Sequence, residues 1–78
     1  MFEYEVCEEN LYHEDIGEYV SYGIKAFSIS MNCRTEIAFV SDVSVDKTAV
    51  RNLCKKCTLG NLHPIHLMDV VEDFLCNI

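Results

Sequence analysis

The sequence predicts an α+β domain in which a three-stranded antiparallel sheet is followed by two amphipathic helices packed on one face, in the order β-β-β-α-α. Two observations support this class. The first half of the chain alternates apolar and polar residues and is rich in β-branched and aromatic side chains, whereas the second half repeats apolar residues at helical spacing. With 78 residues, half of them hydrophobic, one proline and three glycines, we expect a single domain over residues 1–78.

The first strand is predicted over residues 2–7, where apolar and other residues alternate strictly. Its apolar face carries Phe2, Tyr4 and Val6. Residues 8–17 lose this period and end in a glycine, so we expect a loop there, or a hairpin connection with irregular ends. After the second strand, residues 32–34 supply a turn and residues 35–43 form the returning strand.

The second strand, predicted over residues 18–31, changes the side on which its apolar residues lie. Up to Ala26 they have even numbers, whereas Phe27, Ile29 and Met31 have odd ones. A β-bulge explains such a change, because one extra residue flips every later side chain. Alternatively the strand runs past the core, and these three residues form an exposed apolar surface for a partner.

The first helix is predicted to begin after Ser44, as N-cap, with Asp46 in its first turn. Gly60 is the expected stop. One helical face carries the apolar residues Ala49, Val50, Leu53, Cys54 and Cys57.

The second helix is predicted to open at Pro64, which suits the first helical position, with His63 as N-cap. Its apolar residues repeat with the clearest helical period in the chain, at Leu67, Val70, Val71, Phe74, Leu75 and Ile78. The opposite, polar face carries Asp69, Glu72 and Asp73.

Three stretches resemble a family of small bacterial domains of unknown function: "YGIKAF" at 22–27, "VSDVSVDK" at 40–47 and "HPIHLMDVVEDFL" at 63–75. Members of that family end in a helix that reads H-L-x-D-V-V-E-D-F-L. The resemblance implies a cytoplasmic bacterial protein and offers no catalytic residues. The family pattern has Ser or Asp before the proline, so His63 departs from it.

Charge is distributed unevenly along the chain, which has a net charge of −7. Residues 1–24 carry seven acids and no Lys or Arg, residues 25–58 carry six bases and three acids, and residues 59–78 carry three acids. Because an acidic protein repels a phosphate backbone, we expect no nucleic-acid binding. The basic middle could meet an acidic patch on a partner or on a second copy. Without an export signal or an apolar membrane span, we expect a cytoplasmic protein with no membrane contact.

A zinc site is the first alternative function. Cys54, Cys57, His63 and His66 lie within thirteen positions in the order C-x2-C-x5-H-x2-H, and zinc favours sulfur and nitrogen ligands. Two features weigh against it. The interval between the two pairs is shorter than the ~12 residues of a zinc finger, and the helical face places Cys54 in the core.

Disulfide redox chemistry is weighed on the same two cysteines. A C-x-x-C redox motif normally lies at a helix N-terminus, whereas this one lies near a C-terminus.

An acid–base pair is the second alternative. His66 shares a helix face with Asp69 and Asp73, at i+3 and i+7, so a carboxylate could stabilise its imidazolium. The sequence supplies no nucleophile motif or phosphate-binding loop to go with it. We therefore expect an interaction or regulatory module without a cofactor, which binds a protein partner or itself, rather than an enzyme.

Overall fold

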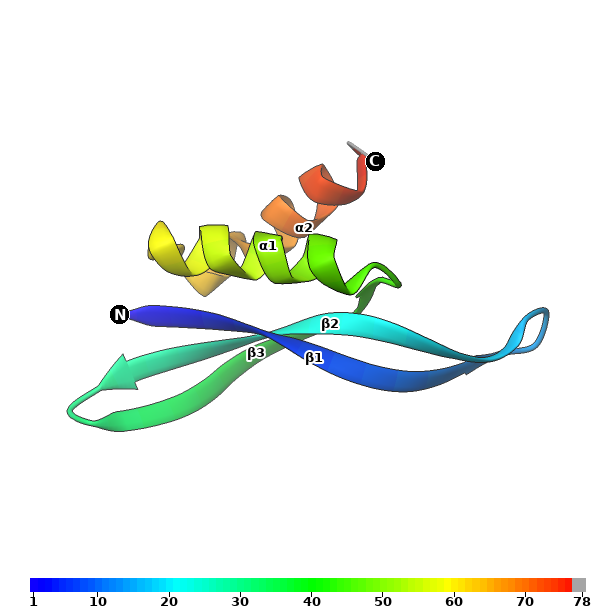
Figure 1. The fold of residues 1–78 in the computed structure, drawn as a ribbon. Helices are drawn as coiled ribbons and strands as arrows, with labels where there is room; N and C mark the ends of the chain where they lie inside the picture. Colours follow the sequence, from blue (N-terminus) through cyan, green and yellow to red (C-terminus); the bar gives the residue numbers. More distant parts are fainter. Residues whose placement is uncertain (77–78) are drawn as a thin grey trace.

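The computed structural model describes residues 1–76, and it confirms the predicted order of a three-stranded antiparallel sheet followed by helices. The strands are β1 (Phe2–His13), β2 (Gly17–Ser30) and β3 (Cys33–Ser44), and they lie in that order across the sheet. The helices are α1 (Lys47–Leu59), a 3-10 turn η1 (Pro64–His66) and α2 (Leu67–Cys76). Figure 1 shows both helices on the same side of the sheet, as predicted. Ile78 lies outside the described residues.

The core lies between the sheet and the helices, chiefly under α1, which contacts all three strands. Even-numbered residues of the first two strands point toward the helices, because cross-strand partners such as Tyr4 and Ala26 share a face. The predicted apolar face of α1 is confirmed, and on that of α2 Leu67 and Val71 are buried, whereas Leu75 is 43% exposed. The buried apolar residues are Tyr4, Ile24, Ala26, Val43, Val50, Cys54, Cys57, Leu67 and Val71.

The first hairpin is longer than predicted. Of the two alternatives for residues 8–17, the loop is wrong, and the hairpin connection is right but shorter than expected. β1 continues to His13, and its pairing with β2 runs without interruption from Phe2↔Ser28 to His13↔Gly17. Only residues 14–16 form the turn, and Gly17 takes a φ of 75° that favours glycine. No helix covers this end of the sheet, so neither face needs to be apolar and the alternating pattern disappears from the sequence.

The bulge predicted within the second strand is wrong, because β2 pairs with β1 without a register shift. A bulge does lie at this point, but its extra residue belongs to the neighbouring strand β3. Ala26 pairs with Ala38 and Phe27 pairs with Glu36, so Ile37 of β3 has no opposite number. β2 itself stays in register with β1, so Phe27 lies on the face away from the helices. A second shift places residues 41–43 opposite Gly23. The predicted turn is one residue off, because Met31 and Asn32 form it with positive φ angles, as two-residue hairpins require.

Helix α1 begins two residues later than the sequence suggested. Asp46 is the N-cap, and its side chain accepts a hydrogen bond from the Ala49 N–H at 3.2 Å. Ser44, predicted as the cap, ends β3 and accepts from the Asp46 N–H at 3.1 Å. Gly60 stops the helix as predicted. Pro64 opens a 3-10 turn rather than the α-helix itself, which starts at Leu67.

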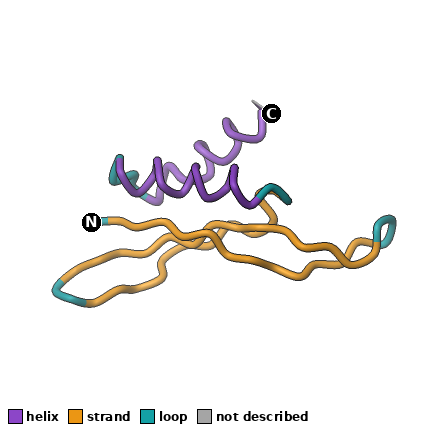
Figure 2. The backbone as a smooth tube through the Cα atoms, in the orientation of Figure 1, coloured by secondary structure: helices purple, strands orange, loops and turns teal. Residues whose placement is uncertain are grey.

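The sheet is longer than the helices that cover it, and its two hairpin turns project at opposite ends. Figure 2 shows these turns in teal, at either end of the orange strands. We call the projecting part of the first hairpin, residues 8–18, the acidic arm, because it carries five carboxylates and no Lys or Arg. Over residues 1–76, no helix combines the length and apolarity needed to cross a membrane.

Candidate functional site

The two cysteines of the C-x-x-C motif face the sheet. Cys54 is 4% exposed and Cys57 is 5% exposed, and both belong to the core cluster. Burial raises the pKa of the Cys54 thiol to about 12, and burial also raises the pKa of Cys57. Both groups are therefore protonated near neutral pH, whereas a thiolate is the form that binds metal or attacks a disulfide.

His63 already has two structural contacts. Its Nδ1 accepts a hydrogen bond from the Ile65 N–H at 3.2 Å, which confirms the predicted N-cap. Its ring lies edge-on to Phe2, with ring centroids 4.8 Å apart. Among the described residues, no group of three or more His, Cys, Asp and Glu side chains lies close enough together to hold a metal ion. The zinc tetrad suggested by the spacing is thus not assembled in this fold.

His66 ends the 3-10 turn and is exposed, and Asp69 lies exposed in the first turn of α2. Asp73 lies one turn further along the same helix and is also exposed. Neither His66 nor Asp69 lines the groove beside β1 described below. The acid–base pair stays a prediction.

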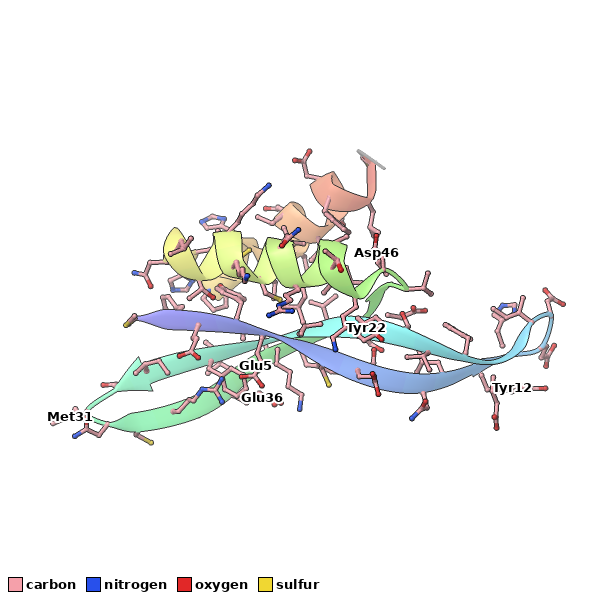
Figure 3. All side chains as sticks on the ribbon, in the orientation of Figure 1. Glu5, Tyr12, Tyr22, Met31, Glu36 and Asp46 are labelled. Carbon is pink, nitrogen blue, oxygen red and sulfur yellow. The ribbon has the colours of Figure 1, made fainter. Side chains whose placement is uncertain are left out.

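The predicted apolar surface at the far end of β2 is partly covered. The Arg34 guanidinium lies 3.6 Å from the centre of the Phe27 ring and pairs with both Glu3 and Glu5. Ile29 is half-buried. Met31 is 96% exposed at the hairpin turn, where Figure 3 shows it at one tip of the molecule. A cation is attracted to an aromatic face and covers it, so of this surface only Met31, at the hairpin turn, is fully open.

Over its first residues, the outer edge of β1 is closed by side chains from the end of α1 and from the connection that follows it. The Phe2 N–H donates to Asn61 Oδ1 at 2.8 Å, and the Tyr4 N–H donates to Thr58 Oγ1 at 2.9 Å. Tyr4 also donates its hydroxyl to the Leu62 carbonyl at 2.5 Å. Burial, followed by the nearby Cys57, raises the pKa of Tyr4 to about 12. These bonds occupy the groups that an added strand would need.

Beyond Tyr4 the same edge is open. Successive residues of a strand alternate the direction of their N–H and C=O groups, so the outward-facing residues after Phe2 and Tyr4 are Val6, Glu8, Asn10 and Tyr12. Within residues 1–76, none of these four backbone N–H groups has a hydrogen-bond partner. This part of β1 is therefore an unpaired strand edge of regular geometry.

A groove of about 500 Å³ adjoins the open edge at Val6, between β1 and α1. On the helix side its wall is formed by Arg51, Lys55 and Leu59, spaced one turn apart. Glu3 and Glu5 lie on the strand side. The groove thus continues the open edge toward a basic stripe of α1.

The acidic arm carries exposed apolar side chains among its carboxylates. Tyr12 is 70% exposed and Ile16 is 67% exposed. Figure 3 shows Tyr12 at the end of the molecule opposite Met31, beyond the end of α1. An exposed strand edge flanked by apolar side chains is the kind of surface that takes part in protein association.

A polar network holds the arm to β3, and sequence reasoning missed it. Ser21, fully buried, places its hydroxyl oxygen 2.5 Å from Asp42 Oδ1, and Tyr19 donates its hydroxyl to Asp42 Oδ2 at 2.9 Å. Glu9 accepts from the Ser41 hydroxyl and from the Asp42 N–H, each at 2.8 Å. Asp42 sits at a φ of 51°, which Asp tolerates better than most residues. The available signal was the pair of short polar residues, Ser41 and Asp42, directly after the apolar run of residues 37–40 in the same strand.

Comparisons with known proteins give a family and no activity. A model described as a family of unknown function (DUF6514) matches residues 1–77. No curated protein and no solved structure matches the chain. The match agrees with the resemblance to a family of unknown function, while the pattern of the C-terminal helix stays a prediction.

Proposed function

Since the chain belongs to the DUF6514 family, whose function is unknown, we propose from its own geometry that it is a protein-interaction module that accepts an extended strand at the open edge of β1. One observation supports this most directly. The edge is regular over Val6–Tyr12 and offers unpaired N–H and C=O groups in a projecting hairpin. Strand addition at such an edge supplies main-chain hydrogen bonds, and neighbouring side chains supply specificity.

The binding properties of the edge are tested by substituting Asn10, whose N–H points outward. Proline at this position removes a donor that the monomer does not use, so the fold should tolerate it. Asn10→Thr keeps the N–H and is the matched control. Peptides selected from a random display library on dilute wild-type protein should bind Asn10→Thr equally and Asn10→Pro about tenfold more weakly or worse.

Amide hydrogen exchange locates the binding. The selected peptides should slow exchange at Val6, Glu8, Asn10 and Tyr12, because these amides acquire partners in the added strand. Binding to Asn10→Pro with unchanged affinity, or protection elsewhere only, would contradict the proposal.

The predicted surface of Phe27, Ile29 and Met31 is kept as a second candidate on one observation, the 96% exposure of Met31. Met31→Asp should then weaken capture of the selected peptides. If only Asn10→Pro has an effect, the β1 edge is the binding surface.

A further inference from the structure

The strand edge raises the question of which strand it accepts, and the charges of the chain indicate an answer. The acidic arm carries Glu8, Glu9, Glu14, Asp15 and Glu18. Helix α1 carries Lys47, Arg51, Lys55 and Lys56, all exposed, and has no Asp or Glu. These two oppositely charged elements meet at the same edge of the same strand, because the groove beside Val6 is lined by Arg51 and Lys55.

We propose that the open edge of β1 pairs with the same edge of a second copy, so that the acidic arm of each copy lies against α1 of the other. This inference rests on the proposed strand-accepting function. The pairing is antiparallel about a two-fold axis, and it joins two three-stranded sheets into one of six strands. In a two-fold dimer the same contact occurs twice, so each chain has to supply both complementary surfaces. This chain does so.

The register follows from the directions of the backbone groups and from charge. Outward-facing residues have to pair with outward-facing residues, and Asn10 opposite Asn10 of the second copy satisfies this rule. Glu8 then lies opposite Tyr12, and Glu9 lies opposite Leu11, so no two carboxylates of the strand residues 7–13 are direct partners. Glu9 is also held within its own copy by Ser41 and by the Asp42 N–H.

The same register explains why the arm is acidic at its tip. Val6 lies opposite Glu14 of the second copy, and Asp15 comes to the level of Glu5, whose carboxylate is paired with Arg34 in its own copy. At the next residue, Tyr4, the edge is already closed by Thr58. The turn of the second copy therefore leaves the strand plane beside the groove, whose helix wall carries Arg51 and Lys55. Oppositely charged surfaces of this kind fix register and orientation in an interface.

Charge reversal on each surface tests the pairing. Wild-type protein should dimerise with rising concentration in sedimentation velocity. The tip variant Glu14→Lys/Asp15→Lys and the helix variant Arg51→Glu/Lys55→Glu should each dimerise about tenfold more weakly or worse, because each places like charges in contact. Mixed one to one, the two variants should recover a dimer, since the reversed tip then meets the reversed helix at one contact and the unchanged tip meets the unchanged helix at the other.

Lys56→Glu is the matched control, because Lys56 lies on α1 but does not line the groove. It should dimerise as the wild type does, and circular dichroism of every variant checks that the fold is kept. A wild type that stays monomeric at all concentrations, a dimer unaffected by either reversal, or a mixture that stays monomeric would overturn the inference.

The outcomes also separate this inference from the proposed function. A monomeric wild type whose edge amides are protected by selected peptides refutes self-pairing and retains strand addition. A dimer that survives Asn10→Pro refutes self-pairing at the edge, because its contact then lies elsewhere, whereas selected peptides that bind Asn10→Pro with unchanged affinity refute the proposed function.

Discussion

The two edges of the sheet are built differently. β3 shifts register twice against β2, and Asp42 within it has a positive φ. β1 pairs with β2 over twelve residues without a shift, and its outer edge is closed only where Thr58 and Asn61 reach it. An added strand would lose hydrogen bonds at each irregularity of β3, whereas β1 offers a regular edge from Val6 onward. Irregularity thus protects one edge, and the other edge is available for pairing.

A second difference runs along the strands. Under α1, Ile24 and Ala26 of β2 are buried, whereas Val20, on the same face of β2 but next to the acidic arm, is 43% exposed. The covered half therefore provides the stability of the domain, and the arm adds surface with little core. Each prediction below tests this contrast, beginning with the largest expected effect.

The largest effect should come from truncating Ile24, which is fully buried. Ile24→Ala should lower the free energy of unfolding by about 2–5 kcal/mol, because it leaves a cavity in the core. That is a large part of the ~5–15 kcal/mol typical of whole domains. Val20→Ala, on the same strand but next to the acidic arm, should cost less than about 1 kcal/mol. Urea denaturation followed by circular dichroism measures both, and equal losses would refute the division into a covered half and an arm.

A smaller loss of stability is expected from a substitution at Gly23, which lies opposite the second register shift of β3. A Cβ atom there would lie 2.5 Å from the Val40 carbonyl oxygen and 3.1 Å from Glu9 Oε2. Because the nearest atom belongs to the backbone, Gly23→Ala should destabilise the domain by about 1–3 kcal/mol. Gly60→Ala is the control, since its nearest contact is 3.3 Å away at a φ of −81°. If both variants melt at the same temperature, the close approach at the bulge does not constrain the fold.

The sequence predicted the covered half well and the arm poorly, for one physical reason. Where α1 covers the sheet, burial imposes a period of two on β1 and β2, and the helices keep their apolar stripes, so Tyr4, Ile24 and Val50 could be placed in the core. In the arm both faces meet water, so residues 8–13 lack any period although they are a strand. The candidate site lies in the region without a burial pattern.

For a related reason, the Cys and His residues with zinc-like spacing do not come together as a metal site within residues 1–76. Cys54 and Cys57 obey the helical period of the core, whereas His63 serves as a helix cap. These residues are close in sequence and have suitable ligand atoms, but the two cysteines pack in the core and the histidine caps a helix. The N-cap of α1 moved from Ser44 to Asp46 because β3 runs further than its apolar pattern, which the bulges interrupt.

At Tyr4, the β1 edge is closed by a single side-chain group, the hydroxyl of Thr58. Thr58→Val keeps the shape of the side chain but leaves the half-buried Tyr4 N–H without its acceptor, which should cost about 1–2 kcal/mol. Thr48→Val, at an exposed position of the same helix, is the control and should change stability by less than ~0.5 kcal/mol. Amide exchange at Tyr4 should accelerate in the first variant only. An unchanged exchange rate would mean that Thr58 does not close the edge.

The smallest effect near neutral pH concerns the groups buried behind that closed edge. Burial raises the pKa of Cys54 from 9.0 to about 12 and that of Tyr4 from 10.0 to about 12, so the folded state holds these protons more tightly than the unfolded state. Their contribution to stability is complete below about pH 9 and is lost as the pH rises toward 12. Urea midpoints should therefore be level from neutral pH to about 9 and then fall. Cys54→Ala starts from a lower stability because of its cavity, but its midpoint should fall less steeply above pH 9, since one of the two protons is absent. If the urea midpoints of the variant and the wild type fell in parallel above pH 9, the core would not hold the Cys54 thiol protonated. The contrast between the buried and the open half of the edge would then need another explanation.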